Sequence, residues 1–100
     1  MTAIPNDATI VRSDHVVAND LSDTEAVMLD IERGTYFGVR DAGRAIWNEL
    51  EVPTSLDAIC ARMIERFEVD EETCRRDVGR FLEDLAAQGL IEIRDDSASP

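Results

Sequence analysis

The sequence predicts an α+β domain with a winged helix-turn-helix-like arrangement, in which a three-stranded antiparallel sheet is followed by three helices. Residues 15–39 are rich in Val, Leu, Ile, Thr and aromatic side chains, which favour strands. Residues 41–88 repeat apolar side chains at the spacing of amphipathic helices. Because 100 residues suffice for one hydrophobic core and a short sheet needs a cover, we expect the helices to pack on the sheet.

Both ends of the chain are expected to lie outside the folded unit. Residues 1–14 show little periodicity and include a Pro-Asn-Asp run, which predicts a flexible lead-in. Residues 95–100 are mostly polar, which predicts a tail that frays. One domain is therefore expected over residues 15–94.

Alternation of apolar and polar residues assigns faces to the predicted strands. In the third strand, Phe37 and Val39 share the face expected to be buried, and Tyr36 and Gly38 share the opposite face. In the second strand, Met28 is expected on the outer face with Tyr36, because branched apolar side chains occupy the alternate positions. The strands are expected over residues 15–20, 25–31 and 35–39, with a turn at 32–34.

Residues that favour N-caps precede each of three apolar stripes, which predicts helices over about 42–50, 54–67 and 70–88. Only about three residues separate the second helix from the third, which is the length of a helix-turn-helix connection. Gly89 is placed to end the third helix, and residues 90–93 are suited either to a short final strand or to docking on the rest of the domain. The expected caps are Asp41, Thr54 and Asp70.

The charge of the chain argues against several partners. It has 22 acidic and 10 basic side chains, a formal net charge of −12, and every basic side chain is arginine. Nucleic acids and anionic membranes attract the opposite charge, so neither is an expected partner. No apolar run has the length of a membrane helix, and the N-terminus lacks the basic and apolar regions of a signal peptide. We therefore expect a cytoplasmic protein.

Residues that perform catalysis or bind metals are sparse. His15 is the only histidine, and Cys60 and Cys74 form no CxxC pair, which leaves no ligand set for zinc. The two cysteines fit small buried thiols in a reducing compartment. No nucleophile has a partner base, and the glycines lack the spacing and the lysine of a phosphate loop. We therefore expect no enzyme activity, no cofactor and no metal.

A carrier protein is one alternative, because carriers are also small and acidic. They bear a serine for a phosphopantetheine arm at the start of a helix, and Thr54-Ser55-Leu56 opens the second predicted helix. The carrier signature has an aspartate before the serine, where this chain has a threonine, and carriers are helical bundles. The strand-rich residues 24–39 therefore disfavour a carrier.

A winged-helix DNA-binding regulator is a second alternative, because the predicted fold class includes such proteins. The third helix carries three arginines, as a recognition helix does, but acidic side chains interrupt them and the whole chain is negative. The arginines are Arg75, Arg76 and Arg80, and the acidic residues are Asp77, Glu83 and Asp84.

Residues 36–47 are the most informative stretch, and they resemble the PqqD-like family of peptide-recognition domains, which serve pathways of ribosomally made, post-translationally modified peptides. Members typically show an aromatic pair, a hydrophobic-Asn step, a Gly and an Ile-Trp pair, followed by a Thr, a Phe-Leu pair and a Gly-Leu-Ile-like exit. The resemblance spans about residues 15–94, and Val39-Arg40 replaces the hydrophobic-Asn step. The matching residues are Tyr36-Phe37, Val39-Arg40, Gly43, Ile46-Trp47, Thr54, Phe81-Leu82 and Gly89-Leu90-Ile91.

This resemblance implies a non-catalytic adaptor in natural product biosynthesis. Family members bind the leader segment of a precursor peptide as an added strand beside the third strand, in a groove against the last long helix. They present the leader to a modifying enzyme, such as a peptidase, cyclase or radical enzyme. A free edge over residues 35–39 suits this role, because its unpaired N–H and C=O groups are a template for another strand. The same edge permits a homodimer.

The third predicted helix offers a flank for the peptide. At about 100° per residue, Arg75, Gly79, Leu82 and Ala86 lie along one flank of its buried stripe. The small residues on this flank allow either a peptide backbone or another helix to approach closely, and the arginine can pair with a leader carboxylate. The residues expected to bind the peptide are Met28, Thr35, Tyr36, Phe37, Gly38, Val39, Arg75, Gly79, Leu82 and Ala86.

Overall fold

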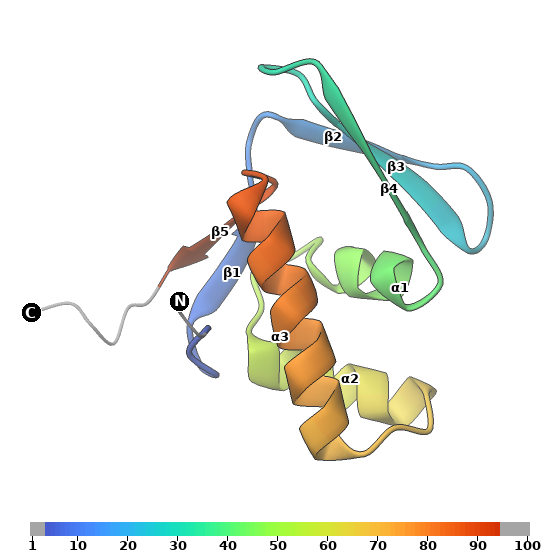
Figure 1. Ribbon diagram of the computed structural model, residues 1–100, viewed down its shortest axis with the longest axis vertical. Helices are drawn as coiled ribbons and strands as arrows, with labels where there is room; N and C mark the ends of the chain where they lie inside the picture. Colours follow the sequence, from blue (N-terminus) through green and yellow to red (C-terminus); the bar gives the residue numbers. More distant parts are fainter. Residues whose placement is uncertain (1–3, 95–100) are drawn as a thin grey trace, which may run out of the picture.

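The computed structural model describes residues 4–94 and confirms the predicted order of strands and helices (Figure 1). A three-stranded antiparallel sheet is followed by three helices, as the sequence predicts, and further strands lie near the two ends. The predicted tail at 95–100 lies outside the described residues. The elements are β1 (Thr9–Arg12), β2 (Val16–Asp20), β3 (Glu25–Asp30), β4 (Thr35–Arg40), α1 (Ala42–Glu49), α2 (Leu56–Arg66), α3 (Glu71–Ala87) and β5 (Ile91–Arg94).

The main sheet has the order β2-β3-β4, so β2 and β4 are its edge strands. In its register, Val17 lies opposite Leu29, which lies opposite Tyr36. The turn from β3 to β4 passes through Gly34 at φ 70°, a conformation that glycine adopts at little cost. The buried carboxylate of Asp30 stabilises this turn, because its Oδ1 accepts two backbone N–H groups at 3.0 and 3.1 Å.

Strands β1 and β5 form a separate two-stranded sheet. The sequence pattern predicts only the second of these strands. The two strands pair antiparallel and lie side by side in Figure 1. Ile10 is fully buried, and its backbone exchanges hydrogen bonds with Thr54 at 2.7 and 3.1 Å. The final strand expected at 90–93 is confirmed, but the flexible lead-in over 1–14 is wrong for residues 9–12. The four residues of β1 are too few to show the alternation that marks a strand, and their pairing partner β5 lies at the other end of the chain.

Of the four signals expected at helix ends, two are confirmed, one is wrong, and one residue holds the cap position without a capping hydrogen bond. Asp70 caps α3 through its Oδ2, which accepts a first-turn N–H at 3.0 Å, and Gly89 follows the helix with φ 79°. The cap of α2 is Ser55, whose Oγ accepts a first-turn N–H at 3.2 Å, and not Thr54, whose backbone pairs with β1. Asp41 stands at the N-cap position of α1 in the left-handed region (φ 55°), and its side chain makes no capping hydrogen bond.

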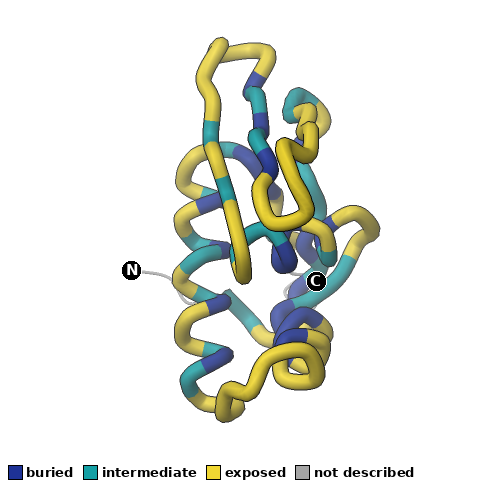
Figure 2. The backbone as a smooth tube through the Cα atoms, turned by 90° about the vertical axis from the view of Figure 1, so that its right-hand side faces the viewer, coloured by how far each residue is buried: buried dark blue, intermediate teal, exposed yellow. Residues whose placement is uncertain are grey.

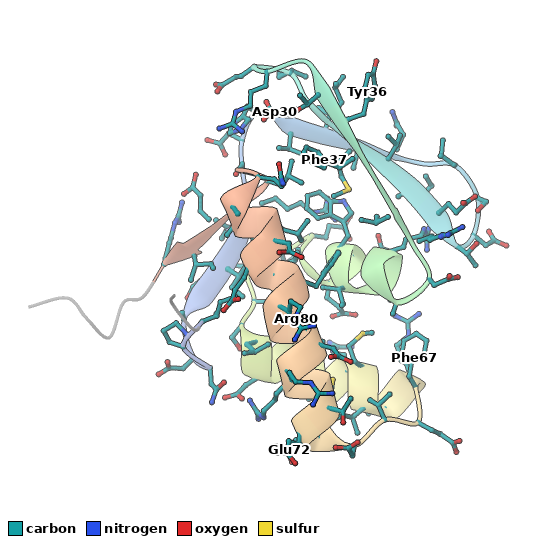
Figure 3. All side chains as sticks on the ribbon, in the orientation of Figure 1. Asp30, Tyr36, Phe37, Phe67, Glu72 and Arg80 are labelled. Atoms are coloured by element: carbon teal, nitrogen blue, oxygen red, sulfur yellow. The ribbon has the colours of Figure 1, made fainter. Side chains whose placement is uncertain are left out.

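The face of β3 that packs on the core is not the face expected from the sequence, which carries Val27, Leu29 and Ile31. Ala26 and Met28 are buried, whereas Ile31 is 58 % exposed. The register explains this, because Met28 lies opposite Phe37, which packs on the core and points towards the helices, while Tyr36 points away from them (Figure 3). The expectation that Met28 faces outward is therefore wrong.

The hydrophobic core lies between the inner face of the sheet and the three helices. Its fully buried side chains come from every layer, and the buried positions of α3 face the rest of the molecule while its outer turns are exposed (Figure 2). No helix among residues 4–94 is both long enough and apolar enough to span a membrane. The core includes Ile10, Met28, Trp47, Leu50, Ile59, Leu82 and Leu90.

Candidate functional site

The outer edge of β4 is the first part of the candidate site. β4 pairs with β3 on one side only, so within residues 4–94 its other side has no strand partner. The side chains alternate along it: Phe37 and Val39 are half-buried, whereas Tyr36, Gly38 and Arg40 are exposed. An edge of this kind presents backbone N–H and C=O groups that a further strand can pair with.

Helix α3 borders this edge through Phe81. A Cβ placed on Gly43, at the start of α1, would lie 3.4 Å from the Phe81 ring and 3.7 Å from Cβ of Val39. These three residues therefore meet where β4 leads into α1. We call the outer edge of β4 (Thr35–Arg40), together with Gly43 and Phe81, the β4 groove.

An apolar cavity of about 330 Å³ continues the β4 groove between the three helices. Phe67 and Val69, which are 38 % and 40 % exposed, stand in the connection from α2 to α3. Phe67 extends from that connection towards α1 (Figure 3). The polar side chains in the lining are Thr73 and Asp77. The apolar part of the lining includes Gly43, Ile46, Met63, Phe67, Val69, Val78 and Phe81.

The flank of α3 beside the β4 groove carries negative charge, whereas Arg40 is exposed on β4 itself. Asp77 and Asp84 are exposed on α3, and at about 100° per residue they share the flank of Phe81. The carboxylate of Asp77 has Arg76 as its partner at 3.5 Å, which is a weak pair between two exposed side chains. A ligand with basic side chains is therefore favoured on this flank.

The structure brings five of the ten predicted site residues together and separates the others. Residues 35–39 all lie on β4, as expected. Met28 and Leu82 have no exposed surface, so they support the groove from within the core. Ala86 is half-buried and packs against the same core.

The flank of α3 that carries Arg75 and Gly79 faces away from β4. Both residues line a different cavity, together with Ile4 and Leu56 from the opposite side of the helix. Gly79 lies about 200° around the helix from Phe81, which is the residue that reaches β4. A Cβ at Gly79 would meet no atom of the described residues within 4 Å, so no helix within residues 4–94 packs on it.

The flank of α3 that meets the β4 edge is therefore the one with Phe81, and not the flank with Arg75 and Gly79 that the helical spacing favoured. The residues expected from the sequence do not include Phe81, Gly43, Phe67 or Asp77, which line the β4 groove or the cavity that continues it. The family-like Phe-Leu pair and the Gly before Ile-Trp were signals for the first two. The connection residue Phe67 had no such signal, because its position depends on how α2 and α3 pack.

The residues that suggested a carrier protein or a DNA-binding regulator have structural roles within the fold. The hydroxyl of Ser55, the serine considered for a carrier, caps α2 by accepting the N–H of Ala58. The guanidinium of Arg75, on the helix considered for DNA recognition, pairs with the carboxylates of Asp57 and Glu71. Its positive charge is thereby offset within the protein.

The two cysteines pack as buried thiols. Both are free, and Cys74 Sγ donates to the Cys60 carbonyl at 3.9 Å. Burial, reinforced by the hydrogen bond with Cys74, raises the pKa of Cys60 to about 12. This thiol is therefore protonated at neutral pH. Residues 4–94 contain no group of three or more His, Cys, Asp or Glu side chains placed to hold a metal ion.

The fold and the site define a small α+β domain with an open strand edge beside its last long helix. A family profile described as Coenzyme PQQ synthesis protein D (PqqD) matches residues 25–91. The chain therefore belongs to the PqqD family, which confirms the resemblance seen in the sequence.

Solved structures show the same architecture. The chain is similar to the structure of TbiB1 in complex with the TbiA(beta) leader peptide, with a TM-score of 0.79 and 36 % identity, over 86 % of this chain and 99 % of that one. It is also similar in fold to a lasso peptide synthetase B1 complexed with the leader peptide, with a TM-score of 0.74 and 19 % identity, over 83 % and 96 % of the two chains. No curated protein gives a match.

Proposed function

We propose that this protein is a non-catalytic adaptor that binds the leader segment of a ribosomally made precursor peptide and presents it to a modifying enzyme. The main structural support for this function is the free edge of β4, which lies beside α3 and next to an apolar cavity. TbiB1, which is 36 % identical over 86 % of this chain, was solved with a leader peptide bound. Neither structural comparison favours the DNA-binding alternative.

In this proposal the leader adds to β4 as a fourth strand of the main sheet. Backbone hydrogen bonds along Thr35–Arg40 supply affinity that is largely independent of sequence. Leader side chains on the inner face contact Phe37, Val39 and Phe81, and an apolar side chain beyond the strand enters the cavity. The exposed Asp77 on the same side favours a leader that carries a basic residue there.

The outer face of the main sheet is the surface we assign to the modifying enzyme. Val17, Leu29 and Tyr36 form one row across all three strands, and Val17 and Tyr36 are 48 % and 72 % exposed. The outer face of such a sheet is usually polar, so an apolar row that ends on β4 suits a partner that also reaches the leader strand. The net charge of −12 favours a basic docking face on the enzyme and opposes a second acidic copy of this chain.

A scan of N-methylated leader peptides tests strand addition. Replacing a backbone N–H by N–CH₃ removes one hydrogen bond and leaves every side chain in place. We expect the Kd from fluorescence polarisation to rise about tenfold at alternate leader positions and little in between, because strand pairing has a period of two. A scan in which every position tolerates methylation would overturn strand addition.

A matched pair of protein variants tests the groove. Gly79→Leu adds a side chain to α3 where nothing lies within 4 Å, on the flank away from β4, and should leave leader affinity unchanged. Phe81→Asp introduces a charge into the β4 groove and should weaken leader binding strongly. The reverse pattern would move the site to the Gly79 flank.

A further inference from the structure

The turn from β3 to β4 contacts α3 at the end of the β4 groove that is farther from Phe81. Arg33 lies in this turn, and its Nη1 donates to the carbonyl of Gln88 at 3.5 Å. A Cβ placed on Gly89 would lie 3.8 Å from Nη2 of the same guanidinium. The turn lies above the C-terminal end of α3 in Figure 1. Because Arg33 comes two residues before Thr35, this contact bears on where β4 begins.

Arg33 supplies a positive charge that α3 lacks at its C-terminal end. The helix has 17 residues and no basic residue in its last turn. The last carbonyls of a helix have no partners within it and carry partial negative charge, which attracts a cation. Arg33 meets these carbonyls from another element, so the attraction acts only while the turn stays on the end of the helix.

The buried carboxylate of Asp30 keeps Arg33 in this position. Its Oδ1 accepts the backbone N–H groups of Glu32 and Arg33. Within residues 4–94 its Oδ2 has no hydrogen-bond partner, and two basic side chains approach it: Arg33 Nε lies at 3.9 Å and His15 Nε2 at 3.7 Å. A buried carboxylate is costly unless a positive charge is near, so Asp30 favours conformations in which Arg33 stays close.

Phe81 and Arg33 thereby connect α3 to the two ends of β4. Phe81 approaches the strand beside Val39, and Arg33 reaches the helix at Gln88. Between Phe81 and Gln88 the helix rises about 10 Å, and between Thr35 and Val39 the strand extends about 13 Å. The two segments are therefore of similar length and run in opposite directions. Since a leader strand must lie about 4.8 Å from β4 to form hydrogen bonds, both contacts limit the space that it enters.

We infer that Arg33 and Asp30 are positioning residues for the leader. By holding the turn from β3 to β4 on the C-terminal end of α3, they fix the Thr35 end of the β4 groove before the leader binds. This inference rests on the proposed function and adds two residues that lie outside the β4 groove. A groove that is held at both ends loses less conformational freedom on binding, which favours tighter binding.

Arg33→Met tests this role, because it removes the charge and every donor but keeps a long unbranched side chain. The leader Kd from fluorescence polarisation should rise about fivefold, which is the upper range for an exposed ionic contact. Arg33→Lys keeps a charge at the helix end and should recover part of this loss.

Arg62→Met is the matched control for Arg33→Met. The Arg62 side chain is 66 % exposed, compared with 63 % for Arg33, and its Nε lies 3.8 Å from a carboxylate oxygen of Glu49. Arg62 lies on α2 and contacts neither β4 nor the end of α3, so the leader Kd should keep its native value. Equal leader affinities for Arg33→Met and Arg62→Met would refute the inference.

Amide hydrogen exchange in the leader complex separates positioning from general stability. In Arg33→Met, the protection that the leader confers should fall about fivefold at the amides near Thr35. Protection near Val39 should stay native, because Phe81 holds that end of the groove. An equal loss of protection at both ends would overturn the positioning role.

Measurements on the free protein distinguish failure of this inference from failure of the proposed function. The Gly34 N–H donates to the Asp30 carbonyl at 2.7 Å, within the turn that Arg33 holds. Asp30→Asn keeps an acceptor oxygen for the turn but removes the charge beside Arg33. In this variant and in Arg33→Met, the Gly34 amide should exchange at least about threefold faster than in the native protein.

A native protein that binds no leader would overturn the proposed function. Unchanged Gly34 exchange in folded Arg33→Met would overturn the inference even when the native protein binds the leader, and this variant decides alone should Asp30→Asn fail to fold.

Discussion

Phe67→Ala tests whether the apolar cavity receives part of the leader. Phe67 is 38 % exposed at the rim of this cavity. A Phe side chain offers roughly 200 Å² of surface, so about 75 Å² is available for a ligand to cover. At about 25 cal/mol per Å² this area is worth about 2 kcal/mol, or roughly a 25-fold change in Kd. We therefore expect Phe67→Ala to weaken leader binding by up to this factor.

Ile64→Ala is the matched control for this prediction. Ile64 is 37 % exposed on α2, almost the same fraction as Phe67, but it does not line the cavity. Fluorescence polarisation with a labelled leader should show near-native affinity for Ile64→Ala, and urea unfolding should show that both variants are folded. Equal affinities for Phe67→Ala and Ile64→Ala would refute the assignment of the cavity to the leader.

Three further predictions concern the outer face, the core and the helix cap. Tyr36→Glu should leave leader affinity within about twofold of the native value and slow leader processing by the modifying enzyme at least tenfold; unchanged processing would remove the outer face as the docking surface. Met28→Ala should lower the free energy of unfolding in urea by about 2–5 kcal/mol, because it leaves a cavity in the core. Ile31→Ala should lower it by less than about 0.5 kcal/mol. Similar losses of stability in the two variants would contradict the assigned face of β3. Hydrogen bonds from Thr73 lower the pKa of Asp70, so its contribution to stability is present above its unfolded pKa and is lost as the pH falls through the lowered folded value. Asp70→Asn should therefore unfold with a weaker dependence on acid pH, and an unchanged dependence would contradict the cap.

Local sequence patterns predicted the order of strands and helices well, because the caps and turns that bound these elements depend on residues that are close in the sequence. The cap at Asp70, the turn at Gly34 and the helix end at Gly89 all follow from side chains or backbone freedom within a few residues. The edge position of β4 also followed, since the short turn at 32–34 pairs it with β3 and the chain then turns into a helix.

The errors arose where distant parts of the chain decide the structure. The face of Met28 is set by its pairing with Phe37. Thr54 does not cap α2 because β1, more than 40 residues away, takes its backbone hydrogen bonds. The groove-facing flank of α3 is set by the contact of Phe81 with Gly43. Periodicity within one helix defines its buried stripe, but not which border of that stripe meets the open strand.

These differences change which residues we expect to contact the leader. Arg75 pairs with acidic side chains of its own protein on the far side of α3, so it is removed from the set expected to contact the leader. Phe81, Phe67 and Asp77 take its place around β4. We therefore expect leader residues beside α3 to be apolar or basic, where the pairing of Arg75 with a leader carboxylate had favoured an acidic residue.

Amide hydrogen exchange of β4, measured with and without the leader, tests strand addition most directly. In the free protein, the β4 amides that point away from β3 should exchange rapidly, because no strand covers that edge. Saturation with the leader should slow exchange at alternate residues within Thr35–Arg40 by at least tenfold, as new backbone hydrogen bonds form. Unchanged exchange along β4 in a protein that binds the leader would contradict the account.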